Sequence, residues 1–516
     1  MILVVDFGGQ TAHLIKRRIN DLGADAKLVN PQDIVSEIKK NNPSGIILSG
    51  GPSSVYQRGA PTISSNIFEH NIPILGICYG FMTISKLLGG KVIAGKKEYG
   101  PARLELGIMN YELGIIKGVK KSSTVWMSHG YEIVKLPKGF EILGLTSHVP
   151  FAFTANNKRN IFGVLFHPEV EHTEEGIKVL TNFLGICGVS GSAKNLNPDS
   201  IGVNIPSMVS EIRNTIGNGY VIGAISGGVD STVAGTLCAK AIGKRFIPVY
   251  VENGLMREGT EKHVRKIFKK FDIVPKVINC EQEMLKRLKG VTDPEKKRTI
   301  IGNLYIEIFE REFEKLKKTK PVTHLLQGTI YSDVIESQGT KHSAKIKSHH
   351  NVGGLPSEMK LKLLEPVRFL YKDEVRTLGK KLGLPEDFIW KQPFPGPGYA
   401  IRIRGEVTKE RLDKQKMADE IILDELEKAN LLKKVFISFP VLTGAESTAV
   451  KGDGRFFGEV IAVRIVESND VMTSTWARVP YDTLQRISSR IVNEVPHVSR
   501  VVYDITTKPP ATMEWE

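Results

Sequence analysis

The sequence predicts an α/β protein, with two successive doubly wound α/β domains followed by a small α+β domain. Over residues 1–188, short apolar runs that end in turns alternate with amphipathic stretches, a pattern typical of a sheet covered by helices. A second series of this kind follows a segment rich in Gly, Ser, Asn and Pro. From residue 392 onwards, a long helical pattern stands beside alternating strand-like runs, which favours an antiparallel sheet with helices.

Length and composition narrow the class of protein. A chain of 516 residues exceeds one ordinary domain, and its 41% hydrophobic and 25% charged residues are typical of soluble globular proteins. No apolar run is long enough to span a bilayer, and the opening residues lack the basic stretch of a secretory signal. The 4 cysteines form no Cys-x-x-Cys pair, so we expect no disulfide framework, a cytoplasmic location and no membrane partner.

The charge balance leaves the class of partner open. Lys and Arg number 71 against 56 Asp and Glu, a formal net charge of +15. Such an excess suits anionic partners, either nucleotides or nucleic acid. A lysine-rich solvated surface explains it equally well, because the lysines are spread widely and form no long basic arm.

Two punctuated segments suggest the domain boundaries. The Gly-, Ser- and Asn-rich stretch over 189–206 is typical of an interdomain linker. QPFPGPG at 392–398 marks a second boundary, because consecutive Pro and Gly continue neither a helix nor a central strand. The expected division is 1–188, a linker at 189–206, 207–391 and 392–516.

In the first domain, the stretch GICYG predicts a nucleophilic thiol. Cys78 follows an apolar run and is flanked by glycines, as in the tight strand-to-helix turn that lifts a nucleophile above a sheet. The partial positive charge at a helix start stabilises a thiolate. The amide of Tyr79 then points to where an oxyanion would form. Taken alone, Cys78 is just as readily a small buried hydrophobe.

A second motif, FHPE, supplies the groups that would activate this thiol. His167 is a candidate base for Cys78, and Glu169 is placed to orient its imidazole, since residues two apart in a strand share a face. The glycine turn SGGPSSVY adds Gly51, whose amide is a candidate second oxyanion donor.

These three motifs, in this order and spacing, resemble those of the class I glutamine amidotransferases. The resemblance implies that Cys78 attacks the side-chain amide of glutamine, releasing ammonia and leaving a glutamyl thioester that water hydrolyses. It also implies that His167 serves first as base and then as acid.

In the second domain, SGGVDS predicts a phosphate-binding loop at a helix start. It lacks the lysine of a Walker A loop and does not match the dinucleotide fingerprint. Asp230 cannot attract phosphate, so a magnesium ion carried by the phosphates is its expected partner. The candidate ATP-binding residues are Ser226, Gly227, Gly228, Val229, Asp230, Ser231 and Thr232.

This loop is similar to that of the ATP pyrophosphatases. In that group the loop grips the β- and γ-phosphates as a leaving group while the substrate attacks the α-phosphate. Further stretches, among them IKSHHNVGGLP, QPFPGPGYAIRI and YDITTKPPATMEWE, resemble the GMP synthetase family over the whole chain. The resemblance implies that XMP, ATP and glutamine give GMP, AMP, pyrophosphate and glutamate through an adenyl-XMP intermediate.

The same resemblance assigns further residues. It implies XMP binding by Arg298, Lys508 and Glu514, with Lys508 at the XMP phosphate. Asp333 is a candidate magnesium ligand, and Lys372 is a candidate for the adenylyl transition state, although either residue fits a structural role. The polar, glycine-containing stretch IKSHHNVGG is expected to form a lid, or else an ordinary exposed loop. The C-terminal module resembles the family's dimerisation domain, which implies a homodimer.

Several positions depart from the family's pattern. The family usually has Ser at Gly9 and Asp at Tyr131, where the Asp is expected to anchor the glutamine amino group. Because Tyr131 replaces this Asp, the affinity for glutamine is in question unless Glu132 makes the contact in its place. A Gln that contacts XMP is usual near Ile437. Two further departures are Ser332, where Pro is usual, and Glu252, where Asp is usual.

Two other functions compete with this interpretation. An RNA-modifying ligase would use the same adenylylation chemistry, but sulfur transfer needs further reactive cysteines, and ammonia would have no role in it. A non-catalytic scaffold with a degenerate triad conflicts with the intact Cys78, His167 and Glu169. We therefore expect ATP, XMP and glutamine as substrates, Mg²⁺ as the cofactor that accompanies ATP, and no nucleic-acid partner.

Overall fold

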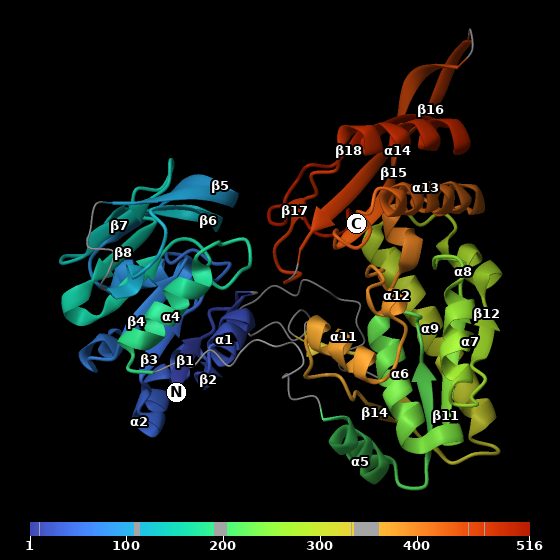
Figure 1. The fold of residues 1–516 in the computed structure, drawn as a ribbon, viewed down its shortest axis with the longest axis horizontal. Coiled ribbons are helices and arrows are strands. Elements are labelled where there is room, and N and C mark those ends of the chain that lie inside the picture. Colours follow the sequence, from blue (N-terminus) through green and yellow to red (C-terminus); the bar gives the residue numbers. More distant parts are fainter. Residues whose placement is uncertain are drawn as a thin grey trace.

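The computed structural model describes residues 1–9, 11–107, 114–189, 204–331, 333–334, 361–451, 454–468 and 470–516. Its strands form three sheets, one in each predicted domain (Figure 1). The two α/β units and the α+β unit agree with the predicted fold class. The domain limits remain predictions; helix α5 begins at Ile205, two residues before the expected start of the second domain.

The first sheet has 9 strands in the order β2-β1-β3-β4-β9-β8-β7-β5-β6. The strands β2, β1, β3, β4 and β9 are parallel to one another. The strands β8, β7, β5 and β6 extend the sheet in antiparallel fashion. Its strands are β1 Ile2–Val5, β2 Ala26–Val29, β3 Gly45–Leu48, β4 Ile74–Ile77, β5 Lys91–Leu106, β6 Ser122–Lys135, β7 Glu141–Leu145, β8 Phe153–Asn156 and β9 Ile161–Val164. Its helices are α1 Ala12–Asp21, α2 Ile34–Asn41, α3 Tyr79–Leu87 and α4 Gly176–Ile186, with short 3-10 turns η1 Pro31–Asp33, η2 Ser65–Glu69, η3 Gly114–Ile116 and η4 Asn157–Arg159.

The second sheet has 5 parallel strands in the order β12-β11-β10-β13-β14. Successive strands are added on one side of β10 up to β12 and on its other side from β13 onwards. Parallel α/β sheets bind ligands at the carboxyl edge beside such a reversal of strand order, here between β10 and β13. Its strands are β10 Tyr220–Ala224, β11 Phe246–Glu252, β12 Lys276–Asn279, β13 Val322–Leu326 and β14 Lys362–Leu364. Its helices are α5 Ile205–Ile216, α6 Val229–Ile242, α7 Thr260–Lys269, α8 Glu281–Leu288, α9 Pro294–Leu316, α11 Lys372–Lys381 and α12 Glu386–Ile389, with η6 Gly243–Arg245.

The third sheet pairs β16 with β15 and β17 antiparallel and with β18 parallel. Its elements are η7 Gly398–Arg402, α13 Lys409–Lys428, β15 Ile437–Lys451, β16 Gly454–Glu467, β17 Thr475–Trp476, α14 Tyr481–Glu494 and β18 Val498–Tyr503. The long helical pattern expected in this domain corresponds to α13, which ends at Lys428; Asn430 takes a positive φ and the chain turns towards β15.

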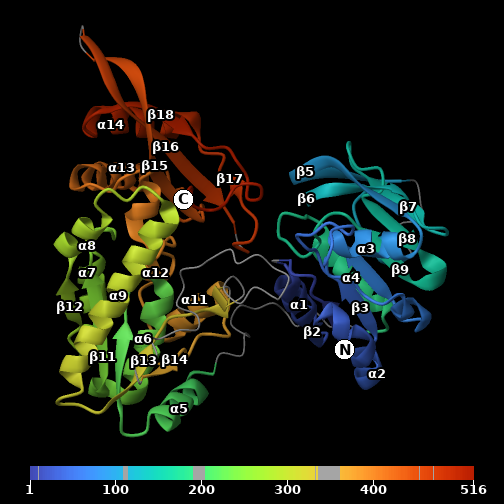
Figure 2. The same cartoon turned by 180° about the vertical axis from the view of Figure 1, so that it is seen from behind.

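The first domain has a separate hydrophobic core, whereas the second and third domains share one. The first domain has a core of its own, built from both faces of the parallel strands. The second and third domains share one core, in which Ile222 of β10 and Val498 of β18 belong to the same cluster. The first domain therefore meets the remainder of the molecule through surface side chains, as the separated ribbons of Figure 2 suggest.

Most of the linker, the candidate lid IKSHHNVGG and Ser332 lie outside the described residues. In the described part of the chain, no helix is both long enough and apolar enough to cross a membrane.

Candidate active site

Cys78 lies at the tip of a tight turn between β4 and α3. Its φ of 50° and ψ of −106° are unusual for a residue with a side chain, and they project the thiol above the carboxyl edge of the sheet. The turn is close-packed, because a Cβ on Gly80 would lie 2.2 Å from the Leu48 carbonyl oxygen. The Cys78 Sγ also lies 3.6 Å from the Ser128 carbonyl oxygen.

The structure brings the three predicted residues of the first domain together. The His167 side chain is hydrogen-bonded to Cys78 on one side, and its Nδ1 lies 2.8 Å from the Oε1 of the buried Glu169 on the other. The expectation that His167 and Glu169 lie within one strand is wrong. Strand β9 ends at Val164, and both residues lie in the following turn, anchored by a bridge between Phe166 and Met127.

The surroundings of the His167 imidazole determine its pKa. Burial disfavours the imidazolium, but the Glu169 carboxylate and the hydrogen bond to Cys78 outweigh burial and raise the pKa of His167 above its ordinary value. His167 can therefore accept a proton at neutral pH and keep it close to Cys78.

The candidate oxyanion donors surround the same thiol. Tyr79 is the first residue of α3, where amides have no acceptor within the helix. Gly51 lies against Tyr79 and Phe7 and lines the cavity that contains Cys78. A Cβ at Gly9 would lie 2.4 Å from the Gly50 carbonyl oxygen. The backbones at Gly9 and Gly50 therefore pack more closely than a residue with a side chain at position 9 would allow.

Residues of β5 and β6 form one wall of the cavity that contains Cys78. Tyr131 lines the cavity, as do Lys97 and His129, whereas Glu132 packs on Gly95 and is not part of the cavity wall. Burial lowers the pKa of His129 to about 4, so its ring is neutral beside His167 at physiological pH.

In the second domain, SGGVDS forms a compact loop between β10 and α6. Gly227 has a φ of 78°, which glycine adopts without strain, and Gly228 precedes the helix. The Ser226 and Ser231 hydroxyls lie 2.9 Å apart, and Ser231 also accepts from the Ser226 amide. Ser226, Gly227, Gly228, Val229, Asp230 and Ser231 line the cavity, whereas Thr232 is fully buried beneath it.

The two predicted magnesium ligands differ in their surroundings. The Asp230 carboxylate forms an ion pair with the Lys372 ammonium, with N–O distances of 2.6 and 2.8 Å. Asp333 accepts a hydrogen bond from the Ile330 amide at 3.1 Å and lines the same cavity. Among the described residues, no group of three or more His, Cys, Asp or Glu side chains could hold a metal by itself.

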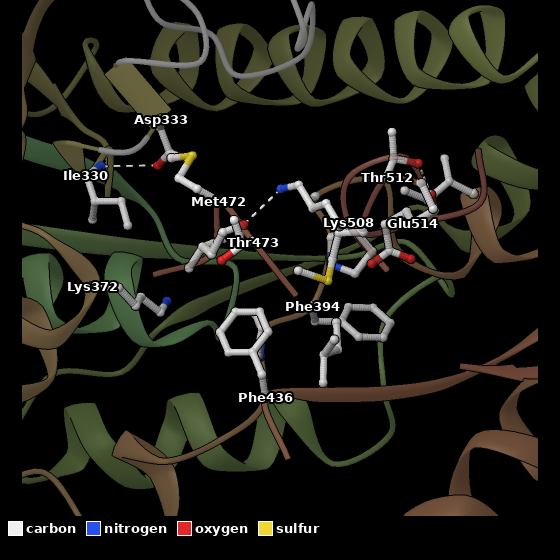
Figure 3. A pocket seen from close by; sticks show the side chains of 18 of the residues that line it. Ile330, Asp333, Lys372, Phe394, Phe436, Met472, Thr473, Lys508, Thr512 and Glu514 are labelled. Carbon is white, nitrogen blue, oxygen red and sulfur yellow. Dashed lines mark hydrogen bonds between the residues drawn. The ribbon is translucent and has the colours of Figure 1, made fainter. Parts of the chain in front are cut away.

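The three predicted XMP residues face the cavity from the second and third domains. Glu514 is held by the fully buried Arg402 through bonds of 2.8 and 2.9 Å. Lys508 donates to the Val471 carbonyl oxygen at 2.8 Å, and Arg298 pairs with Glu295. Figure 3 shows Lys508 and Glu514 on one side of this space and Lys372 and Asp333 across it.

One cavity of about 1400 Å³ connects the two predicted sites. Its wall contains Cys78 and His167, the phosphate loop, and the Lys508–Glu514 region. The two predicted sites therefore share one continuous cavity.

Direct contacts hold the first domain beside this cavity. His13 of α1 lies 2.8 Å, Nδ1 to Oη, from Tyr331, and Arg17 forms an ion pair with Asp373 of α11. On the other side, His172 lies 2.8 Å, Nδ1 to Oγ1, from Thr473.

Sequence reasoning missed several residues of the cavity and its supports. Arg402 fixes Glu514, and the Ser128 carbonyl lies beside the thiol. Lys391 also lines the cavity, and burial beside Arg257 lowers its pKa to about 8. Lys391 directly precedes the conspicuous QPFPGPG stretch, which was a usable signal; Arg402 carried none, because an arginine in a sequence is expected on the surface.

Comparisons with known proteins agree with this geometry. Residues 3–187 match the family model of class-I glutamine amidotransferases, residues 204–329 that of NAD synthase and residues 424–515 that of the GMP synthase C terminal domain. GMP synthases [glutamine-hydrolyzing] from Aquifex aeolicus and Brachyspira hyodysenteriae are 50% and 47% identical, each over 100% of this chain and 99% of the relative. The chain belongs to the glutamine-hydrolysing GMP synthase family. As a member, it is an ATP-dependent ligase of purine nucleotide biosynthesis that joins an amidotransferase domain to an ATP pyrophosphatase domain.

This family membership decides between the functions considered from the sequence. The three matched regions account for both predicted chemistries and for the C-terminal module. They disfavour the RNA-modifying ligase and the non-catalytic scaffold, since relatives named for glutamine-dependent GMP synthesis match over the whole chain.

Proposed function

We propose that this chain aminates XMP to GMP, with ATP cleaved to AMP and pyrophosphate and with ammonia supplied by hydrolysis of glutamine. The observation that carries this proposal is the single cavity, whose wall contains Cys78 with His167 and also the phosphate loop. Ammonia in bulk water would be protonated or lost, so a short path within one shared cavity favours its transfer.

In the amidotransferase half, the Cys78 sulfur attacks the side-chain carbonyl carbon of glutamine, and His167 takes the thiol proton. The amides of Gly51 and Tyr79 stabilise the oxyanion. His167 then gives the proton to the leaving nitrogen, so ammonia departs and a thioester remains. Water, activated by His167, releases glutamate and restores the thiol. Glu169 keeps the imidazole oriented and favours its charged form.

In the synthetase half, the amide and hydroxyl groups of residues 226–231 bind the β- and γ-phosphates of ATP. The C2 oxygen of XMP attacks the α-phosphorus, and pyrophosphate leaves as a unit. Ammonia then attacks C2 of the adenylylated XMP, and AMP leaves to give GMP. Lys508, Arg298 and Glu514 orient XMP within reach of both reactants.

The carboxylates near the phosphate loop fit a magnesium ion that enters with ATP. Asp230 and Asp333 supply hard oxygen ligands, and the remaining positions suit phosphate oxygens and water. Bound there, Mg²⁺ would neutralise charge on the departing pyrophosphate. Lys372, which pairs with Asp230 in this structure, is then free to contact the α-phosphate.

We also propose a homodimer formed by the C-terminal domain. Val450, Phe457 and Tyr481 of this domain are exposed by 73%, 64% and 89%, and a partner copy would cover apolar side chains of this kind. Light scattering at micromolar concentration tests this proposal, and a monomer there would contradict it. The cytoplasm, which holds the nucleotide substrates, is the proposed location.

A substitution at Cys78 tests the division of labour. We expect Cys78→Ala to lose glutamine-dependent conversion of XMP to GMP and to keep conversion with ammonium salts, because the phosphate loop and XMP residues are untouched. The measurement is GMP formation from XMP and Mg-ATP with each nitrogen source. Equal loss with both sources would refute the separation of the sites, and wild-type turnover with neither source would refute the function itself. Turnover of the wild type with ammonium alone would instead implicate Tyr131.

A further inference from the structure

Gln392, the first residue of the QPFPGPG stretch, lines the cavity although its side chain is held in the protein interior. The residue is only 8% exposed. Its Oε1 accepts hydrogen bonds from both the backbone amide and the hydroxyl of Ser438 in β15, each at 3.0 Å. A backbone amide only donates, so the Gln392 oxygen must face Ser438 and the NH2 group occupies the other branch of the side chain. These two bonds fix the amide in one orientation.

The NH2 group of Gln392 is left unpaired by this arrangement. Its Nε2 is buried and has no hydrogen-bond partner among the described residues. Buried polar groups in folded proteins are nearly always paired, and a donor withdrawn from water without an acceptor is unfavourable. Because Gln392 belongs to the cavity wall, a ligand bound in the cavity can supply the missing acceptor.

The preceding residue adds a second donor to the same wall. Lys391 lines the cavity, and its ammonium forms no ion pair or side-chain hydrogen bond within the described part of the chain. The neighbouring Arg257 is different, because the buried Asp419 carboxylate pairs with its guanidinium at 2.6 and 3.0 Å. The wall at 391–392 therefore offers donors and one uncompensated positive charge, which suits a ligand edge that carries oxygen atoms.

Aromatic side chains line the cavity near these donors. Phe394, two residues after Gln392, and Phe436, two residues before Ser438, both belong to the cavity wall. Figure 3 shows their rings below Lys508 in this view. Aromatic rings are suitable surfaces for a planar base, whose polar atoms lie on its rim. The xanthine base of XMP is such a group, with carbonyl oxygens at C2 and C6.

We propose that the Gln392 NH2 group donates a hydrogen bond to a carbonyl oxygen of the xanthine base and so selects a dioxopurine nucleotide. The proposal rests on the function proposed above, because it takes XMP as the nucleotide that binds in this cavity. Ser438 holds the amide oxygen, so the donor is oriented before XMP binds. A base with an amino group at the contacted position would present a donor to a donor and would be rejected.

Replacing the NH2 group by an oxygen tests the proposal. Gln392→Glu keeps the shape of the side chain and an acceptor for Ser438, but presents an acceptor to the base. We expect it to raise the KM for XMP at least about tenfold with ammonium as nitrogen source, and to leave the KM for ATP and glutamine hydrolysis unchanged. Gln392→Met removes the donor without adding a charge and should raise the same KM several-fold.

Ser438→Ala is the matched control for these variants. It removes one of the two bonds to the Gln392 oxygen and leaves the NH2 group in place, so the KM for XMP should stay close to that of the wild type. Thermal unfolding of each variant establishes that it is folded. If folded Gln392→Glu and Gln392→Met both keep the wild-type KM for XMP, or if Ser438→Ala raises it equally, Gln392 is merely structural and the proposal is overturned.

Inhibition by GMP identifies the contacted oxygen. GMP keeps the C6 oxygen of XMP but carries an amino group at C2. A contact with the C2 oxygen predicts that Gln392→Glu strengthens inhibition by GMP while it weakens XMP binding, whereas a contact with the C6 oxygen predicts that both weaken together; either result supports the proposal. Failure of the proposed function looks different, because the wild type would not convert XMP to GMP even with ammonium.

Discussion

At the scale of single residues, the proposed site depends on charged groups that are held by buried partners. Glu169 orients His167 in the first domain, and Arg402 holds Glu514 in the third. Arg402 is fully buried, and its guanidinium lies over the ring of Phe439 at 4.0 Å. Such groups are expensive to leave unpaired, so each partner fixes the position of the residue that meets the substrate.

This argument gives a prediction for Arg402→Met. The substitution leaves the Glu514 carboxylate without its buried partner, which typically costs about 3–5 kcal/mol. We expect a lower melting temperature and a KM for XMP raised at least about tenfold, from thermal unfolding and steady-state assays with ammonium as nitrogen source. Arg265→Met, which breaks an exposed pair with Glu261 on α7, is the control and should change stability by about 0–1 kcal/mol. An unchanged KM for XMP would exclude Glu514 from XMP binding.

At the scale of elements, the sequence was informative where a strand ends in a turn. The motifs around Cys78 and Asp230 follow buried parallel strands of two different sheets. Within each sheet, the turns that follow parallel strands lie at the same edge, the carboxyl edge. The antiparallel strands β5 and β6 left no comparable signal, so the wall that carries Lys97 and His129 could not be placed. Contacts between distant segments, such as His172 with Thr473, obey no local pattern at all.

The close approach of two such turns makes Gly328 a sensitive position. It follows β13, and a Cβ there would lie 2.4 Å from the Cα of Ser231 in the phosphate loop. We expect Gly328→Ala to displace the loop and lower kcat/KM for ATP at least about tenfold, since misplacement by an ångström can cost that much or more. Glutamine hydrolysis without ligands should be unaffected. Gly185→Ala, in α4 with open space around it, should leave both activities unchanged; a normal KM for ATP in Gly328→Ala would show that the loop tolerates the displacement.

At the scale of the molecule, two of the domains are fused by one hydrophobic core, and the amidotransferase domain is attached by polar contacts. Polar interfaces within a chain are compatible with domain motion. His13 of α1 belongs to this interface and faces Tyr331. Burial at the contact lowers the pKa of His13 to about 4.

The lowered pKa of His13 makes docking of the amidotransferase domain dependent on pH. When the domains separate, the His13 ring regains water and its pKa returns towards about 6.5, so between pH 6.5 and 4 the separated state binds a proton that the docked state does not. Docking is therefore unaffected above pH 6.5 and weakens as pH falls below it, by up to about tenfold for each unit. We expect the radius of gyration, measured by small-angle X-ray scattering, to rise between pH 6.5 and 5 in the wild type. His13→Asn keeps an acceptor towards Tyr331 but does not titrate, and should remain docked over this range; an equal expansion of both proteins would show that other groups control docking.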